Sequence, residues 1–321
     1  MKTRWFLTVC AAAGIACLAS ADEKPASLPQ NSGPEARSLL DGRALEAPPL
    51  TPERRAELEA NLSKAIAAYE ANPRDETAIV WLGRRLAYLG RYRDAVEIYS
   101  RGLKEKPGSV ALLRHRGHRY ITLRRFDDAV QDLSRAAGLI ESQQLPDQVE
   151  PDGTPNPAHP PRSSLHENVY YHLGLARYLR GEFDEASRVY RKAMSLLTMN
   201  DDMRVAFRYW LYNAESHAGR LPQAGYALDG ISEKMDVLEN HAYHKLLLAF
   251  KGGGEKVDQA LEGLDRSSLD YLTTAYGVAT WHLTRNNKER ATGLMRDAMT
   301  IEQWWPAFGF IAAEVELSRL K

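Results

Sequence analysis

The chain has 321 residues, 44% of them hydrophobic and 26% charged, which is the composition of an ordinary globular protein. Lysine and arginine together number 42, and so do aspartate and glutamate, so no overall charge favours nucleic acid or an acidic membrane surface as a partner. Any electrostatic choice of partner must therefore be local, and the length allows one to three domains.

The first 21 residues have the pattern of a secretory signal peptide. Lys2 and Arg4 precede an apolar stretch from Trp5 to Leu18, and small residues suited to cleavage follow at 19–21. The apolar stretch is too short for a membrane span, and no later stretch is long and apolar enough for one. We expect cleavage of this leader and export of the mature chain to the periplasm or the medium.

Both cysteines, Cys10 and Cys17, lie inside this leader. Their removal would exclude disulfides and a thiolate metal site from the mature chain. In an alternative interpretation, residues 15–17 belong to a bacterial lipoprotein signal and Cys17 carries a lipid anchor, although Gly14 stands where that signal usually has leucine. Soluble export and lipid anchoring both stay open at this point.

Residues 22–50 contain five prolines and few aromatic residues, which indicates a disordered, flexible tether. Thr51 and Pro52 then have the pattern of a helix start, with Thr51 as the N-cap and Pro52 in the first turn. From there to the C-terminus apolar residues recur three and four positions apart, and no convincing strand pattern alternates. The fold is therefore expected to be all-α.

A spacing of 34 residues recurs along the chain. It separates Gly83 from Gly117, and it also separates Pro73 from Pro107, Tyr92 from Phe126, Ala95 from Ala129, and Tyr99 from Leu133. After an insertion of 23 residues the same offsets return at Gly174, Gly181, Phe183, Ala186, Tyr190 and Ala193, and more faintly at Gly219, Leu221, Ala224 and Leu228. A fixed period of this length indicates a helical repeat architecture.

These residues resemble the tetratricopeptide repeat, a 34-residue helix-turn-helix unit, and the leader suggests its bacterial exported type. The resemblance implies a right-handed superhelical solenoid, because one hairpin cannot bury its apolar face without stacked neighbours. We expect this solenoid over 51–320, with units at 76–107, 110–141, 167–200 and 205–231 and divergent helices at 238–320. The last helix is expected to cap the stack, with a packed face and a wet face that carries Glu314, Glu316 and Arg319.

The small residues of the pattern have an expected steric role. Glycines in the first helix of a unit let its second helix approach closely, and alanines are expected opposite them; these are Gly83, Gly117 and Gly174 with Ala95, Ala129 and Ala186. Arg124 departs from the pattern, since it stands where the turn glycine of the second unit would be.

The insertion at 142–165 is rich in proline and acidic residues, so it should form a loop. Loops of this length are either functional or solvated, and the sequence leaves both open. One hypothesis places the loop over an edge of the groove, where Asp147, Glu150 or Asp152 would approach basic residues. Partner binding would then displace the acidic side chain.

No standard catalytic pattern is visible: there is no phosphate-binding loop, zinc HExxH pair, GxSxG elbow or mature cysteine nucleophile. We therefore predict no catalytic, cofactor or metal residues. His115 with His118, and His241 with His244, are spaced to share a helix face, but neither pair has an identifiable third metal ligand.

The resemblance implies that the first helix of each unit lines a concave groove. The predicted lining is rich in aromatic, arginine, histidine and asparagine side chains and has no acids; it comprises Trp81, Arg84, Tyr88, Arg114, His115, His118, Asn168, Tyr171, His172, Tyr178, Tyr209, Trp210, Asn213 and His217. Aromatic residues and arginine anchor partners at many interfaces. In the alternative, Trp81 and Trp210 simply pack against the next unit.

The predicted function is a non-catalytic scaffold that holds a peptide or protein partner in this groove. Arg84 and Arg114 are suited to an acidic side chain or a C-terminal carboxylate. Two alternatives stay open: a small-molecule or glycan binder, which the aromatic and amide side chains would also suit, and a histidine-dependent enzyme with or without a metal.

Overall fold

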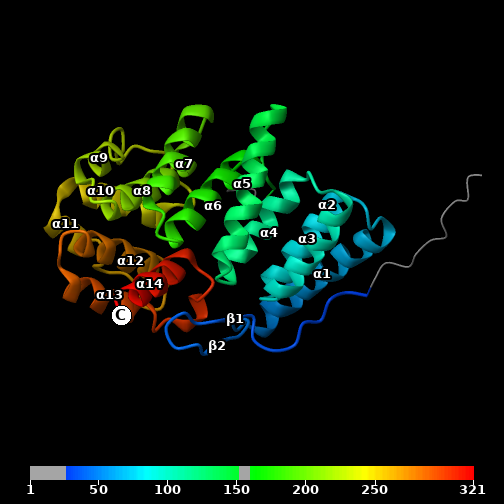
Figure 1. Cartoon of the computed structure of the whole chain (residues 1–321). Coiled ribbons are helices and arrows are strands. Elements are labelled where there is room, and N and C mark those ends of the chain that lie inside the picture. The colour runs from blue at the N-terminus through cyan, green and yellow to red at the C-terminus, as the bar shows by residue number, and fades with distance from the viewer. Residues whose placement is uncertain (1–26, 152–159) are drawn as a thin grey trace, which may run out of the picture.

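The computed structural model describes residues 27–151 and 160–321, so the predicted signal peptide and Cys17 lie outside the described residues. Most of the described residues are helical, and the helices stack as antiparallel hairpins into a curved solenoid (Figure 1), so the predicted all-α repeat fold is confirmed. The elements in chain order are β1 (Ala36–Arg37), β2 (Ala44–Leu45), α1 (Pro52–Ala71), α2 (Glu76–Tyr88), α3 (Tyr92–Glu105), α4 (Val110–Thr122), α5 (Phe126–Gln143), α6 (Leu165–Leu179), α7 (Phe183–Leu196), α8 (Asp201–His217), α9 (Leu221–Tyr226), α10 (His241–Gly252), α11 (Gly254–Gln259), α12 (Leu269–Leu283), α13 (Lys288–Ala298), the 3-10 helix η1 (Glu302–Trp304) and α14 (Phe308–Arg319).

Caps and left-handed turns divide the chain into hairpins. The side chains of Asp75, Ser109 and Ser164 accept backbone N–H groups at the starts of α2, α4 and α6, which satisfies donors that the helices leave unpaired. Gly90 and Gly181 connect the two helices of their hairpins with φ angles of 77° and 82°, a conformation that glycine adopts without strain.

Arg124 adopts the same left-handed conformation in the turn between α4 and α5, with a φ angle of 62°. Its side chain explains why a glycine is absent there. The guanidinium donates to Glu314 of α14 at 2.9 Å and to the Trp305 carbonyl at 3.0 Å. These buried charge-assisted contacts offset the backbone strain of a non-glycine residue in this region.

The repeat glycines allow close packing, but not against the residues that the sequence suggested. A Cβ atom on Gly83 would lie 2.3 Å from the Tyr99 ring, and one on Gly174 would lie 2.4 Å from the Tyr190 ring. The prediction that alanines lie opposite the glycines is therefore wrong in detail. A large side chain, one helical turn after each alanine, covers the glycine.

The predicted disordered tether is ordered from residue 27 onward, and we call residues 27–50 the N-terminal strap. The strap runs along α3, where the Asn31 amide donates to Asp94 Oδ1 at 2.7 Å and the Arg93 backbone N–H donates to the Glu35 carboxylate at 2.9 Å. The tether prediction is thus wrong for the strap. Composition indicated disorder because the strap has little core of its own, and its partners lie on distant helices.

The strap then reaches the C-terminal end of the chain. Its β1 and β2 form a small antiparallel ribbon beside α14 (Figure 1). The Leu39 backbone N–H donates to Glu314 at 3.1 Å, and the Trp305 indole N–H donates to the Glu46 carbonyl at 2.7 Å. Leu45 is only 3% exposed. The strap therefore ties the first repeat to the last helices.

α14 lies inside the solenoid. Every residue from Gly309 to Leu317 is buried, and Glu314 and Glu316 are 0% and 4% exposed. The predicted wet face is therefore wrong for both glutamates. Each is compensated by an arginine, Glu314 by Arg124 and Glu316 by Arg319 at 3.0 Å, as buried carboxylates require.

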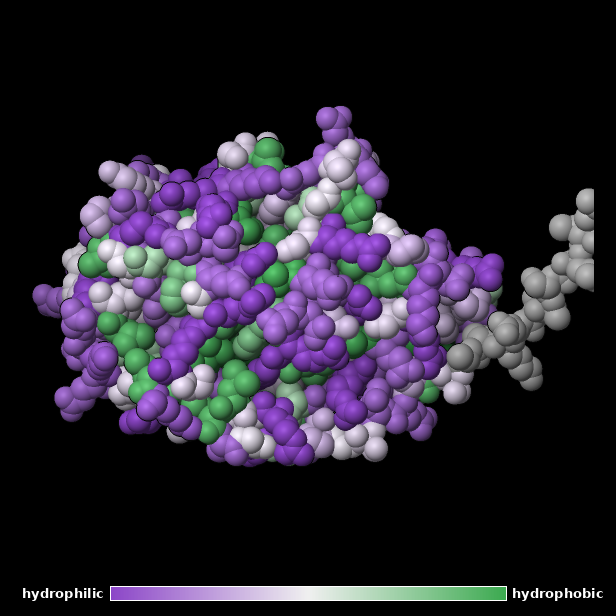
Figure 2. Space-filling view, in the orientation of Figure 1, coloured by the Kyte–Doolittle hydropathy of each residue, from purple (hydrophilic) through white to green (hydrophobic). Residues whose placement is uncertain are grey.

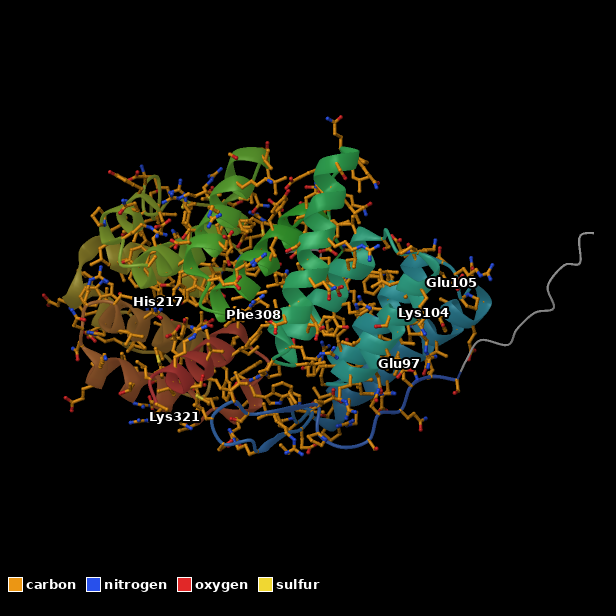
Figure 3. All side chains as sticks on the ribbon, viewed as in Figure 1. Glu97, Lys104, Glu105, His217, Phe308 and Lys321 are labelled. Carbon is orange, nitrogen blue, oxygen red and sulfur yellow. The ribbon has the colours of Figure 1, made fainter. Side chains whose placement is uncertain are left out.

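The outer surface is mainly polar. The face in Figure 2 carries mostly hydrophilic residues, with hydrophobic ones in interrupted patches. Lys104 and Glu105 of α3 are examples of exposed charged residues (Figure 3). Over 27–151 and 160–321, no helix combines the length and the apolar character that a membrane crossing requires.

Candidate functional site

The inner faces of α2, α4, α6 and α8 form one continuous wall. The His118 ring of α4 lies 4.3 Å from the His172 ring of α6, and the Tyr171 hydroxyl of α6 accepts from the Trp210 indole N–H of α8 at 3.0 Å. The structure thus brings together predicted groove residues from different repeats. It also divides the wall into a closed half, on α6 and α8, and an open half, on α2 and α4.

The closed half is filled by the chain itself. Phe308, at the start of α14, lies in the middle of the molecule (Figure 3). Its ring packs against His118, His172 and Tyr171, with centroid separations of 5.4, 5.7 and 6.1 Å. Tyr171 and His172 are therefore buried, and their aromatic surface is already used within the fold.

Other predicted contact residues in the closed half belong to the core. Tyr178, Tyr209, Trp210 and Asn213 are at most 1% exposed, and the His217 side chain is 8% exposed. In this structure they cannot touch a partner, because α10, α12 and α14 cover them. Sequence periodicity places a side chain on the inner face of a helix, but it does not show whether another part of the chain fills the groove.

The open half retains the accessible residues that were predicted. On α2, the Arg84 guanidinium lies 4.4 Å from the Trp81 ring centroid and donates to the Tyr88 hydroxyl at 3.1 Å. Tyr88 is 37% exposed. Aromatic stacking holds the Arg84 side chain in place. Among the described residues it forms no ion pair, so its charge is available to a ligand.

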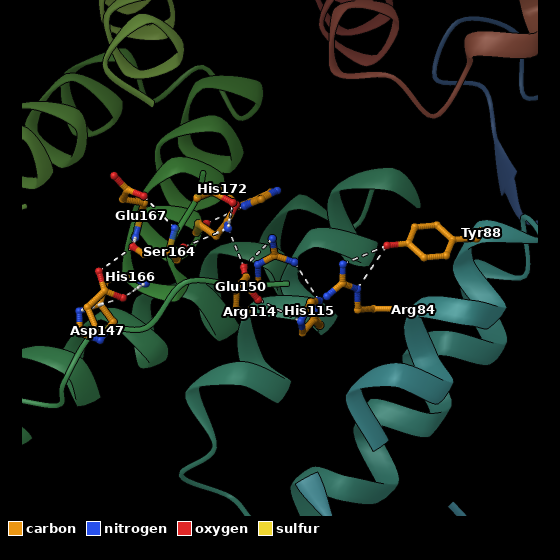
Figure 4. Close-up of polar contacts among 12 residues, drawn as sticks. Arg84, Tyr88, Arg114, His115, Asp147, Glu150, Ser164, His166, Glu167 and His172 are labelled. Atoms are coloured by element: carbon orange, nitrogen blue, oxygen red, sulfur yellow. Dashed lines mark hydrogen bonds and ion pairs between the residues drawn. The ribbon is translucent and has the colours of Figure 1, made fainter. Parts of the chain in front are cut away.

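Glu150, from the insertion loop, lies at the centre of the open half (Figure 4). Its carboxylate lies 3.0 Å from the Arg114 guanidinium, accepts from the Asn168 amide at 2.6 Å, and lies 3.2 Å from His115 Nε2. The structure therefore bears out, for Glu150, the hypothesis that the loop carries an acidic side chain to the basic residues.

Two other acidic residues of the loop have different outcomes. Asp147 accepts from the Ser164 hydroxyl at 2.6 Å and from the His166 backbone N–H at 3.0 Å, so it caps α6 and anchors the loop. Asp152 lies outside the described residues. The ordered arms of the loop thus position Glu150 from both sides.

Burial and neighbouring charges set the protonation of this cluster. Burial raises the pKa of Glu150, but Arg114 and the hydrogen bond from His115 outweigh it and lower this pKa to about 2. Burial, together with Arg114, lowers the pKa of His115 to about 4. Arg114 donates to His115 Nδ1 at 2.8 Å, so the neutral ring carries its proton on Nε2 and donates to Glu150. Near neutral pH, Glu150 is therefore ionised and His115 is neutral.

Sequence reasoning missed Arg119, which follows His118 on α4. Its guanidinium lies 5.5 Å from the Tyr92 ring centroid, and within the described part of the chain it has no ion pair. Burial lowers its pKa, but a guanidinium stays charged in proteins. The sequence feature that points to Arg119 is the clustering of cationic side chains on α4. With Arg84 and Arg114, Arg119 brings the arginines of the open half to three, beside the carboxylates of Glu150 and of Glu76 on α2.

A cavity of about 230 Å³ opens beside Glu150, between α2, α4 and the insertion loop. Its walls include Trp81, Val80 and Ala111 on the helices and Val149 on the loop. The charged lining residues are Arg84, Glu76 and Glu150. The cavity therefore combines an apolar surface with a cation, an arrangement that suits a segment with one apolar and one acidic group.

The described residues contain no group of three or more histidine, cysteine, aspartate or glutamate side chains arranged to hold a metal ion. The two predicted histidine pairs have other contacts. His115 pairs with Glu150, and His244 Nε2 lies 2.8 Å from the Ser232 carbonyl. His118 packs among rings.

Stacked antiparallel hairpins with a common inner wall define the class of the protein as a helical-repeat solenoid. The particular repeat is shown by residues 167–196, which match the family model described as the tetratricopeptide repeat. These residues span most of α6 and α7, the hairpin in which Gly174 packs on Tyr190. The chain therefore contains a tetratricopeptide repeat, and such repeats generally mediate interactions between proteins.

The chain is also similar to individual proteins at low identity. It is 23% identical over 150 residues to the BBSome complex member BBS4 of Bos taurus; the match covers 46% of this chain and about a quarter (24%) of that protein. A tetratricopeptide repeat protein from Parabacteroides merdae is 13% identical, with a TM-score of 0.48, over 80% of this chain and 93% of that chain. YrrB, a tetratricopeptide repeat protein with an unusual peptide-binding site, is 14% identical, with a TM-score of 0.39, over 75% and 93%.

Proposed function

We propose that the protein is a non-catalytic interaction module, and that the open half of its groove binds an acidic segment of a partner protein. The observation that carries this proposal is Glu150. A carboxylate from the chain already occupies the basic wall, where Arg114, His115 and Asn168 contact it. The wall therefore has the geometry of a carboxylate site.

Two further cations indicate that this site takes more negative charge than Glu150 supplies. Arg84 and Arg119 lie on the same wall and have no carboxylate partner among the described residues. An acidic partner residue would give the accessible Arg84 and the partly buried Arg119 a charged hydrogen-bond acceptor. The accessible Trp81 and Tyr88 would add apolar contact beside the charge.

When no partner is bound, Glu150 supplies the carboxylate that pairs with Arg114. The proposed partner carboxylate competes with Glu150 for the Arg114 guanidinium. Glu150→Gln removes the competing charge and keeps the loop, so it should tighten binding of an acidic peptide, provided that thermal unfolding shows an intact fold. Unchanged or weaker binding by the folded Glu150→Gln variant would show that Glu150 does not compete.

Selection from a random peptide library tests the proposal before any natural partner is identified. We expect the mature chain to enrich peptides with aspartate, glutamate or a free C-terminal carboxylate. Replacing Arg84 and Arg114 together with alanine should weaken binding of a selected peptide by about tenfold or more, since hydrogen bonds between charged groups contribute about 1.5–3 kcal/mol.

The matched control replaces Arg135 and Arg296 together with alanine, which removes the same two charges from exposed positions on α5 and α13. It should leave the affinity within about twofold of the wild-type value. Selection of peptides without acidic groups, or equal affinities of the folded groove variant and the control, would overturn the proposal.

We further propose that the protein acts outside the cytoplasm, with the pattern of residues 1–21 as support. N-terminal sequencing and mass measurement of the chain from its native source test this. A mature chain that starts at Asp22 supports soluble export, one that starts at a lipidated Cys17 supports an anchored form, and an intact Met1 contradicts both.

A further inference from the structure

The insertion loop has one open backbone edge. Two hydrogen bonds join its arms, from the Glu150 N–H to the Ser163 carbonyl at 2.9 Å and from the Leu165 N–H to the Gln148 carbonyl at 2.8 Å. Val149 lies between them in an antiparallel bridge. In this kind of pair, the middle residue turns its own N–H and C=O away from the opposite arm. Val149 therefore presents both groups on the outer side.

This edge is accessible and unpaired. Val149 is 61% exposed, and within the described residues nothing hydrogen-bonds to its N–H or its carbonyl. Edges of this kind are templates for the backbone of another extended chain. Pro151 has no N–H and closes the edge two residues further on. A partner strand can therefore pair with this edge in one register, opposite Val149.

The edge borders the cavity that faces α2. Residues Gln148 to Pro151 form one wall of that cavity, and Trp81, Val80 and Arg84 belong to the opposite wall. From the second arm, only Leu165 lines it. An extended segment in the cavity would therefore have a backbone edge on one side and an aromatic and a guanidinium group on the other.

We propose that an acidic segment of a partner protein adds to Val149 as an extended strand and lies between the loop arm and α2. The proposal rests on the function proposed above and specifies how the partner is held. Main-chain hydrogen bonds to Val149 supply sequence-independent affinity, while the side chains supply specificity. An apolar side chain packs on Trp81, and the next inward-facing acidic side chain pairs with Arg84.

Charge favours this occupant over an apolar or basic segment. Arg84 lines the cavity and forms no ion pair among the described residues. The carboxylates that line the cavity are Glu150, which Arg114 neutralises, and Glu76 at the start of α2. A basic segment would be repelled by both arginines, and an apolar one would leave Arg84 uncompensated. The side chains of a strand alternate between its two faces, so the residues that meet Trp81 and Arg84 alternate with residues on the opposite face.

Amide exchange in the wild-type chain tests the strand addition directly, with a library-selected acidic peptide as the probe. The Val149 amide should exchange at least about tenfold more slowly when the peptide saturates the protein, because it gains a hydrogen bond. The Glu150 amide, already bonded to Ser163, is the internal control and should change little. Bound peptide without protection of the Val149 amide would overturn strand addition.

Two substitutions of Val149 distinguish the contribution of its backbone N–H to peptide binding from that of its side chain. Val149→Pro removes the N–H donor and should weaken peptide binding by about tenfold, whereas Val149→Ala keeps the donor and should change it by less than about threefold. Arg84→Ala reports on the underlying acidic site. If Arg84→Ala weakens binding but Val149→Pro does not, strand addition fails and the proposed function stands. If Arg84→Ala has no effect, the proposed acidic site itself fails.

Discussion

At the scale of single residues, Arg124 connects the repeat pattern to the C-terminal helix. Its buried ion pair with Glu314 joins positions 190 residues apart, and both side chains are at most 3% exposed. Arg124→Ala leaves the Glu314 carboxylate buried without its cation, so we expect a loss of about 3–5 kcal/mol in the free energy of unfolding by urea. Adjacent Arg125, whose ion pair with Asp128 is exposed, is the control.

Arg125→Ala should cost less than about 1 kcal/mol. Equal effects of the two substitutions would contradict the structural role of Arg124. The glycine that the repeat pattern favours at this position would relieve the backbone but would not restore stability, because the lost ion pair outweighs the relieved strain.

Three inner-wall histidines make stability depend on pH. Burial lowers the pKa of His115 to about 4, and burial lowers the pKa values of His118 and His172 well below their usual value near 6.5. The unfolded chain therefore binds more protons below pH 6.5, so stability is present above that pH and is lost as the pH falls. Glu150 adds a further loss between about pH 4.5 and pH 2, because its pKa is also lowered.

His118→Phe tests this dependence, because His118 already packs among the rings of His172 and Phe308. We expect the decrease in unfolding free energy between pH 7 and pH 5 to be smaller in His118→Phe than in the wild-type chain, as measured by urea denaturation. His241→Phe, at an exposed position, controls for the added ring. An unchanged decrease in His118→Phe would show that His118 is already free to take up a proton in the folded state.

At the scale of elements, two helix glycines distinguish the effect of tight packing on stability from the effect of helix propensity. A Cβ on Gly174 would lie 2.4 Å from the Tyr190 ring, whereas a Cβ on Gly138 of α5 meets nothing within 4 Å. Gly174→Ala should therefore destabilise the fold by about 1–3 kcal/mol through overpacking. Gly138→Ala should stabilise it by about 0.5–1 kcal/mol through helix propensity. Thermal unfolding distinguishes the two, and the same sign for both would contradict the packing described for α6 and α7.

Element prediction succeeded where local patterns determine the structure. Thr51 caps α1 and accepts from the Arg54 N–H, and the 34-residue spacing recurs between the left-handed turns at Gly90 and Arg124. It failed where a distant residue reverses the local preference. Glu314 and Glu316 suggested a wet face on α14, but their arginine partners come from the second repeat and from the end of the same helix.

At the scale of the whole molecule, the chain occupies much of its own groove. α14 and Phe308 fill the half on α6 and α8, and the N-terminal strap holds this arrangement from outside. Repeat phase alone predicted that Trp81 and Trp210 face inward, and both do. It did not show that Trp210 is in the core while Trp81 lines a cavity, because this depends on where α10 and α12 lie.

The arrangement of the whole molecule also limits where a partner can bind. Among the described residues of the predicted groove, only the wall of α2 and α4, together with the loop arm at Gln148–Pro151, combines an accessible aromatic surface with arginines. Photo-crosslinking of a selected acidic peptide to the wild-type chain, followed by mass-spectrometric mapping, locates the bound peptide. We expect crosslinks on Trp81 to Tyr88 and on Gln148 to Pro151. Crosslinks confined to outer helices such as α9 or α13 would contradict binding in the open half of the groove.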